Sequence, residues 1–159
     1  MIRTAHPGDF GFIHEIAARA DNQRFIVDED DAALNNYLAD PDSTLVIWEY
    51  EGAPAGYAIF CDLTNPANRA ELRRLALFTE GQGLGRQFLL DLIGYAFETL
   101  RVNRLWLDVA FDNPRARAAY ERAGFQYEGT LRQHWKRPAG DVADLHLLSL
   151  LRSEWGAAK

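Results

Sequence analysis

An apolar strand that runs directly into a glycine-rich turn and a long helix constrains the fold of this chain more than any other feature. Residues 71–78, ELRRLALF, are apolar enough to be buried on both faces and predict a central strand. Alternation along the strand predicts that Leu75 and Leu77 face one side. The other side is then expected to carry Leu72, Ala76 and Phe78.

The turn after this strand contains Gly81, Gly83 and Gly85, and apolar residues at helical spacing predict a helix from Leu84 to Leu100. Glycines let a ligand approach the backbone, and the free N–H groups of a first helical turn favour anions, so this turn is suited to hold a phosphate or pyrophosphate. A dinucleotide fingerprint would need another glycine at a position held by Arg86 or Phe88, and no P-loop lysine is present. A turn without any ligand remains the alternative.

Length and composition favour one soluble globular domain covering residues 1–159. The net charge of -6 argues against a general nucleic-acid or anionic-membrane binder, because such proteins need a basic excess. A single cysteine, Cys61, excludes an internal disulfide, and no run of apolar residues is long enough to span a bilayer. The N-terminal residues also lack the apolar segment of a secretion signal. We therefore expect a cytoplasmic protein.

The remaining segments predict an α+β fold with a mixed, mostly antiparallel sheet and helices on both of its faces. Further strands are expected at residues 2–5, 44–63 (a hairpin), 104–110, and in a closing hairpin around residues 138–140. Further helices are expected after the turns at residues 6–9, 28–31 and 112–113. The strand and helix of residues 71–100 lie in the middle of this order.

Two residues of the helix after residue 112 are candidates for one ligand site. Asn113 is placed to cap the helix, with Pro114 at its first position, and Tyr120 follows two turns later on nearly the same face. A phenol with a pKa of about 10 is able to protonate a departing thiolate. The alternatives are a cap without further function and an ordinary half-buried aromatic residue.

Two carboxylates are candidates for a general base. Asp108 shares one face of its strand with Trp106, and Glu71 begins the central strand. Each could equally form an ion pair, with Arg104 for Asp108 and with Arg73 or Arg74 for Glu71. His134 and Trp135 either line an acceptor pocket or only pack, and His6 and His14 are expected to be turn and surface residues. No Ser/His/Asp, CxxC or HExxH pattern is present, so we expect no metal and no covalent nucleophile.

Two motifs at a characteristic spacing resemble the GNAT superfamily of N-acetyltransferases: EGQGLGR at residues 80–86 and DNPRARAAYERAGF at residues 112–125. The order of elements resembles that fold over nearly the whole chain. The C-terminal segment from residue 128 to 155 is similar to the Rim-type branch, which contains ribosomal-protein N-terminal acetyltransferases and enzymes with other acceptors. The resemblance implies an acetyltransferase domain that uses acetyl-CoA.

The resemblance also implies roles for individual residues. The pyrophosphate of acetyl-CoA would be held at Glu80, Gly81, Gln82, Gly83, Leu84, Gly85 and Arg86. The pantetheine arm would pair with the backbone of Leu75 and Leu77 and lie near Asn113. Tyr120 would protonate the CoA sulfur, and Asp108 or Glu71 would act as the base. Glu80 replaces the Gln or Arg that is usual in the family, and a carboxylate there would repel a pyrophosphate unless it points to solvent.

The reaction that the resemblance implies is acetyl transfer from acetyl-CoA to a primary amine by direct attack. A protein or peptide N-terminus, with a pKa of about 7.7 to 8.0, is more easily neutral than a lysine amine, and small-molecule amines are also expected acceptors. Two alternatives are a non-catalytic acyl-CoA-binding regulatory module and a mononucleotide-binding domain that uses the same turn. We expect a monomer or a homodimer, with neither nucleic acid nor membrane as a partner.

Overall fold

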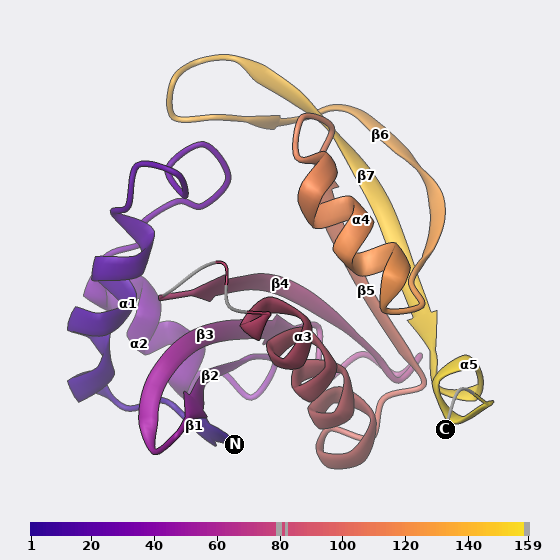
Figure 1. The fold of residues 1–159 in the computed structure, drawn as a ribbon, viewed down its shortest axis with the longest axis horizontal. Coiled ribbons are helices and arrows are strands. Elements are labelled where there is room, and N and C mark those ends of the chain that lie inside the picture. The colour runs from indigo at the N-terminus through magenta and orange to yellow at the C-terminus, as the bar shows by residue number, and fades with distance from the viewer. Residues whose placement is uncertain (79–80, 82, 158–159) are drawn as a thin grey trace.

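In a computed structural model that describes residues 1–78, 81 and 83–157, the chain forms one seven-stranded mixed sheet (Figure 1). Only β4 and β5 pair in parallel, and the other neighbours are antiparallel. In spatial order the strands are β1 (Ile2–Thr4), β2 (Thr44–Tyr50), β3 (Ala53–Cys61), β4 (Arg69–Leu77), β5 (Arg104–Ala110), β7 (Val142–Leu151) and β6 (Gln126–Lys136). This arrangement confirms the predicted fold class and the central position of β4.

Helices cover both faces of the sheet, as predicted. One face packs against α1 (Phe10–Ala17), which follows the short 3-10 helix η1 (Pro7–Asp9), and against α2 (Asp31–Ala39). The opposite face packs against α3 (Leu84–Gly94), the π-helical turn η2 (Tyr95–Thr99) and α4 (Pro114–Arg122). The helix expected as one unit over residues 84–100 therefore widens after Gly94. A short helix that the sequence did not predict, α5 (Arg152–Ala157), follows β7.

A β-bulge in β4 changes which side chains share a face. Phe60 of β3 pairs with Leu72, but the preceding Ile59 pairs with Arg74, so Arg73 is an extra residue in the ladder. As a result Leu72 packs in the same core as Leu75 and Leu77, on the side of α3 and α4. The prediction that Leu72 faces the other side was wrong, because simple alternation cannot register an inserted residue. Ala76 and Phe78 do lie on the side of α1 and α2.

The two parallel strands separate partway along their length. Pairing between β4 and β5 runs from Arg69 with Arg104 to Glu71 with Trp106, and no later pair forms among the described residues (Figure 1). Both strands continue beyond this point, β4 to Leu77 and β5 to Ala110. The N–H and C=O groups on the facing edges of both strands are thus left without a ladder partner at the centre of the sheet.

No helix among the described residues is long and apolar enough to cross a membrane.

Candidate active site

The glycine turn leads from β4 to the N-terminus of α3. Gly81 and Gly83 have φ angles of 100° and 74°, in the left-handed region, and a Cβ on either one would have no heavy atom within 4 Å. Gly83 is the N-cap of α3, so the first N–H groups of this 11-residue helix follow it directly. Open glycine backbone beside a helix N-terminus fits the pyrophosphate of a nucleotide cofactor such as CoA.

Other predicted cofactor residues lie around this turn. Leu75 and Leu77 are half-buried on β4 and precede the turn, on the strand whose edge faces the split. Leu84 is half-buried in the core, and Gly85 and Arg86 are exposed on the first turn of α3. Glu80 and Gln82 lie outside the described residues. Of the predicted loop, the structure thus describes Gly81 and residues 83–86, and the last three of these form the first turn of α3.

Asp108 lies on β5, just beyond the last pair with β4, and its strand neighbours Leu107 and Val109 point into the core under α3 and α4. Its side chain is therefore on the opposite face of the sheet. Burial raises the pKa of Asp108, and the charge of Glu71 raises it further, while His134 and Arg73 lower it. No described residue donates a hydrogen bond to this carboxylate. Arg104, its partner in the alternative interpretation, instead binds Glu128, with N–O distances of 2.5 and 2.9 Å.

Glu71 occupies the same face as Asp108, because Ala70 and Leu72 on either side of it point into the core under α3 and α4. Its carboxylate accepts a hydrogen bond from Arg73, the bulged residue, at 2.9 Å. The ion pair that was the alternative interpretation of Glu71 is thus present. Arg74, the other suggested partner, binds Glu29 at 2.9 Å.

Tyr120 lies on α4, on the other side of the sheet from these carboxylates. Its ring packs half-buried in the core, 5.9 Å from the ring of Phe125 between centroids. Burial raises the pKa of Tyr120 well above its usual value, and the charge of Asp108 raises it further, so the phenol stays protonated. Asn113 caps the helix as predicted, since its Oδ1 accepts from Ala116 N at 3.3 Å.

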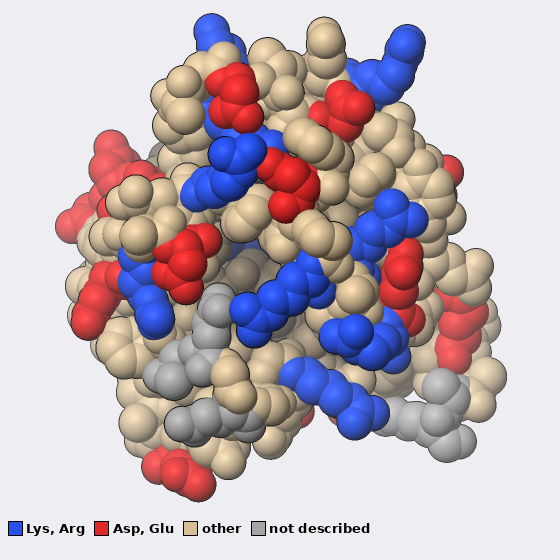
Figure 2. All heavy atoms as spheres, turned by 45° about the horizontal axis from the view of Figure 1, so that its top comes forward, with Lys and Arg blue, Asp and Glu red and all other residues tan. Residues whose placement is uncertain are grey.

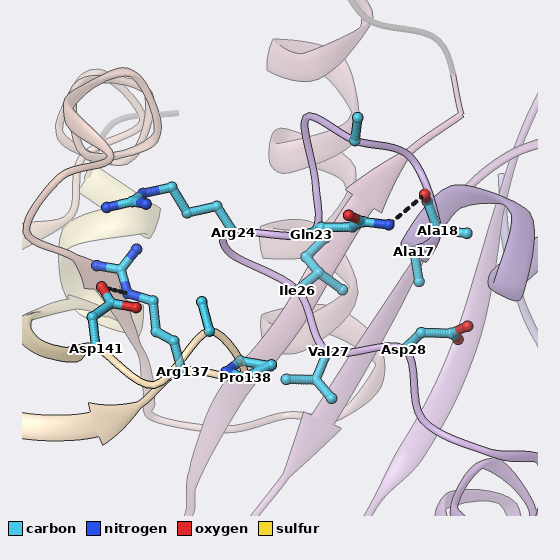
Figure 3. A pocket seen from close by; sticks show the side chains of 12 residues that line it. Ala17, Ala18, Gln23, Arg24, Ile26, Val27, Asp28, Arg137, Pro138 and Asp141 are labelled. Atoms are coloured by element: carbon cyan, nitrogen blue, oxygen red, sulfur yellow. Dashed lines mark hydrogen bonds and ion pairs between the residues drawn. The ribbon is translucent and has the colours of Figure 1, made fainter.

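A pocket of about 770 Å³ lies between the segment that joins α1 to α2 and the turn that joins β6 to β7 (Figure 3). It is lined by Ala17, Ala18, Ala20, Gln23, Arg24, Ile26, Val27, Asp28, Arg137, Pro138, Ala139 and Asp141. With the top of Figure 1 turned forward, the surface is hollowed near its centre, and side chains of both charges border the hollow (Figure 2). His134 and Trp135, which the sequence suggested as lining residues of an acceptor pocket, do not line this one.

Asp112 connects three segments at this pocket. It accepts hydrogen bonds from Arg24 of the α1–α2 segment and from Arg137 of the β6–β7 turn. Although burial opposes the effect, these two arginines hold the pKa of Asp112 below its usual range. Because Asp112 precedes the cap of α4 and follows β5 by two residues, the pocket lies at the end of β5 beyond Asp108.

The histidines and Trp135 take separate places. His134 is exposed on β6 and lies close enough to Asp108 to lower the pKa of that carboxylate. The guanidinium of Arg137 lies 5.4 Å from the centroid of the Trp135 ring. His14 binds two carboxylates, and His6 lies 3.5 Å from one. No group of three potential metal ligands forms among the described residues.

Comparison with known proteins identifies the family. The model of the acetyltransferase (GNAT) family matches residues 9–125, which include the carboxylates, the glycine turn and Tyr120. The chain belongs to the GNAT family. Members of this family use acetyl-CoA as a cosubstrate, and the resemblance described above is confirmed.

Relatives of this GNAT protein include N-terminal and polyamine acetyltransferases. It is 35% identical over 111 residues to the putative ribosomal N-acetyltransferase YdaF of Bacillus subtilis, an alignment covering 69% of this chain but only 60% of that protein. It is 30% identical over 130 residues to the N-alpha-acetyltransferase RimI of Mycobacterium tuberculosis, covering 79% and 80% of the two chains. These relatives support the predicted Rim-type branch.

Solved structures of similar fold include spermidine N-acetyltransferase from Vibrio cholerae in complex with CoA and spermine. The match covers 98% of this chain and 96% of that enzyme's chain, with a TM-score of 0.82 and 21% identity. A chimera of that enzyme matches with a TM-score of 0.85 and 22% identity, over 99% of both chains. At this identity the similarity shows a shared fold.

Proposed function

We propose that this GNAT protein transfers an acetyl group from acetyl-CoA to a primary amine by direct attack. The observation that carries the proposal is the placement of Asp108 and Tyr120 on opposite faces of the sheet at the split between β4 and β5. Asp108 is a half-buried carboxylate whose raised pKa makes it a stronger base, and Tyr120 is a protonated acid. A thioester in the split would lie between them.

The cosubstrate is proposed to approach from the side of α3 and α4. The turn at Gly81 and Gly83 and the first N–H groups of α3 would hold the pyrophosphate, together with Leu84, Gly85 and Arg86. At Leu75 and Leu77, the backbone on the unpaired edge of β4 would form hydrogen bonds with the pantetheine arm. The amide groups of that arm offer N–H and C=O groups, as a neighbouring strand would. These contacts fix the thioester in position, which is much of what an acyl transfer requires.

The chemical step then needs two proton transfers. The neutral amine forms a bond to the thioester carbon, and its extra proton passes to Asp108, directly or through a water molecule. The carbon–sulfur bond breaks, the sulfur takes the Tyr120 proton, and an amide and free CoA result. Glu71 is the second candidate for the base, and its carboxylate already accepts a hydrogen bond from Arg73.

The acceptor is proposed to enter through the pocket between the α1–α2 segment and the β6–β7 turn, on the face that carries Asp108. Its amine is a protein N-terminus or a small-molecule amine. Support for both classes comes from the names of the relatives, which describe N-alpha and spermidine acetyltransferases.

Thiol release from acetyl-CoA tests the proposal, with N-terminal peptides, amino acids, polyamines and aminoglycosides offered as acceptors. Release that depends on an acceptor supports the transferase. If acetyl-CoA raises the melting temperature but no acceptor causes release, the protein is a non-catalytic acyl-CoA-binding module instead. If acetyl-CoA gives no shift, the proposed cofactor site is wrong.

A further inference from the structure

Arg137 is buried in the wall of the pocket, with 2% of its side chain exposed. Its Nη2 donates to Asp112 at 2.9 Å, and its Nε lies 3.3 Å from Asp141 without the geometry of a hydrogen bond. Both Nε and Nη1 therefore lack a hydrogen-bond acceptor in the described structure. Buried guanidinium N–H groups are costly to leave unbonded, so Arg137 has two unused donors beside its hydrogen bond to Asp112 and its ion pair with Asp141.

A second arginine reaches the same place from the opposite wall. Arg24 extends from the α1–α2 segment (Figure 3). It donates to Asp112 from Nε at 2.9 Å and from Nη2 at 2.6 Å. More than half of its side chain is exposed, so it is able to exchange partners with little loss of packing. Two guanidinium groups thus share the single carboxylate of Asp112, and one of them has unused donors.

The carboxylates that line the pocket already have cationic partners. Asp28 accepts from His14 at 2.7 Å, and Asp141 lies beside Arg137. An acceptor with several ammonium groups would have to displace these partners while lying near two arginines of like charge. The pocket is therefore poorly suited to a polyamine, although polyamine acetyltransferases are among the relatives of this chain.

We propose that the acceptor is an amine that carries a carboxylate or similar anionic group, bound by Arg137 with help from Arg24. This inference rests on the proposed acetyl transfer and names its substrate class. A guanidinium binds a carboxylate through two parallel hydrogen bonds. The Arg137 guanidinium contacts two aromatic rings, at 5.8 Å from the centroid of Phe111 and 5.4 Å from that of Trp135, which helps to orient it for such a pair. The amine at the other end of the acceptor would then point along β5 toward Asp108.

Three matched series of acceptors test the charge preference. Each contains a primary amine on a linear chain of the same lengths, ending in a carboxylate (ω-amino acids), a methyl group (alkylamines) or a second ammonium (diamines). We expect kcat/KM, measured by thiol release, to be highest for a carboxylate-ended acceptor of suitable length. It should be about 10- to 100-fold above its methyl-ended match, the factor that a hydrogen bond to a charged group supplies.

Variants show whether Arg137 causes this preference. Arg137→Gln should remove most of the difference between the carboxylate and methyl series, through a higher KM for the carboxylate-ended acceptors. Arg24→Gln, at an exposed site, should reduce the preference by a smaller factor and provides the test if Arg137→Gln does not fold. Arg69→Gln is the matched control, because Arg69 is an exposed arginine of β4 paired with Asp62.

Equal or better turnover of the diamine series by the unchanged protein would overturn the inference and leave acetyl transfer intact. A preference that persists in both Arg137→Gln and Arg24→Gln would also overturn it, because the anion would then bind elsewhere. Absence of thiol release with all three series and with the peptides above would instead refute the transferase itself.

Discussion

The carboxylates of Asp108 and Glu71 face the same side of the sheet from adjacent strands, close enough for the charge of Glu71 to raise the pKa of Asp108. Glu71 belongs to the last pair of β4 with β5, and Asp108 lies two residues beyond its partner Trp106. Burial is the larger cause of the raised pKa. Two acidic groups that could each be the base are therefore coupled, and a change at one alters the other.

Replacing Glu71 with Gln tests which carboxylate is the base. If Asp108 takes the amine proton, loss of the Glu71 charge lowers the pKa of Asp108, and the acidic limb of the kcat/KM profile moves to lower pH. Asp108→Asn should abolish that limb and reduce kcat/KM by about 10²- to 10⁴-fold. If Glu71→Gln itself abolishes the limb, Glu71 is the base and the assignment to Asp108 is wrong.

Asp108→Asn should also make the protein more stable at neutral pH. A carboxylate with a raised pKa in the folded state binds its proton more tightly there than in the unfolded chain. Ionisation of Asp108 therefore lowers the free energy of unfolding once the pH exceeds the unfolded pKa of about 3.9, and the loss of stability is complete above the folded pKa. We expect a higher melting temperature for Asp108→Asn at pH 8 and a smaller difference at pH 4. An equal or lower melting temperature at pH 8 would contradict the burial of an ionised Asp108.

Tyr120→Phe should reduce kcat by about 10²- to 10⁴-fold, the range for loss of a general acid. The variant keeps the ring that packs against Phe125, so the melting temperature should change little. Tyr127→Phe is the control, since Tyr127 is an exposed tyrosine of β6 whose hydroxyl only contacts Thr130. Thiol release under saturating acetyl-CoA gives kcat directly. Unchanged turnover in Tyr120→Phe would mean that water or another group protonates the sulfur.

Local patterns in the sequence predicted most of the fold. Asn113 and Pro114 predicted the start of α4, and Gly124, with a φ of 106°, follows the end of the helix. The bulge at Arg73 could not be predicted, because it is defined only by the pairing of β4 with β3. The error at Leu72 follows from that single inserted residue.

The site was only partly predictable for a similar reason. Arg104 and Asp108 face the same side of β5, but four residues of strand separate them by roughly 13 Å, so they do not pair. Arg104 instead pairs with Glu128 from β6, two strands away. Asp112 binds Arg24, which is 88 positions earlier in the chain. Contacts over such separations depend on the tertiary fold and leave no short-range pattern.

Gly83→Ala should weaken binding of acetyl-CoA. The φ of 74° costs a residue with a Cβ about 1–2 kcal/mol, and the added methyl group would stand on the open backbone where the pyrophosphate is proposed to bind. We expect KM for acetyl-CoA to rise with little change in kcat, and the free energy of unfolding to fall by about 1 kcal/mol. Gly94→Ala is the matched control.

Gly94 lies at the end of α3 with a φ of −56°, and a Cβ there would meet no heavy atom within 4 Å. Alanine should therefore stabilise the protein by up to about 1 kcal/mol without affecting KM. If both variants leave the KM for acetyl-CoA unchanged, the glycine turn does not contact the cosubstrate.

His14 should make the stability of the protein depend on pH near neutrality. Its Nδ1 lies 2.7 Å from Asp28 and its Nε2 lies 2.6 Å from Asp31. The contact with Asp31 connects α1 to the start of α2. Hydrogen bonds to Asp28 and then Asp31 raise the pKa of His14 above 6.5. The stabilisation is thus fully present below the unfolded pKa of about 6.5, and it is lost as the pH rises through the higher folded pKa.

Urea unfolding of the unchanged protein and of His14→Gln measures this effect across pH 5 to 9. We expect His14→Gln to be less stable at pH 5.5 to 6, where the imidazole is charged, and the difference to shrink steadily toward pH 9. Asp21→Asn is the control, because Asp21 lies between α1 and α2 and the described structure gives it one ion pair, with Arg19 at 3.8 Å. A stability difference that stays constant with pH would show that His14 contributes packing rather than charge.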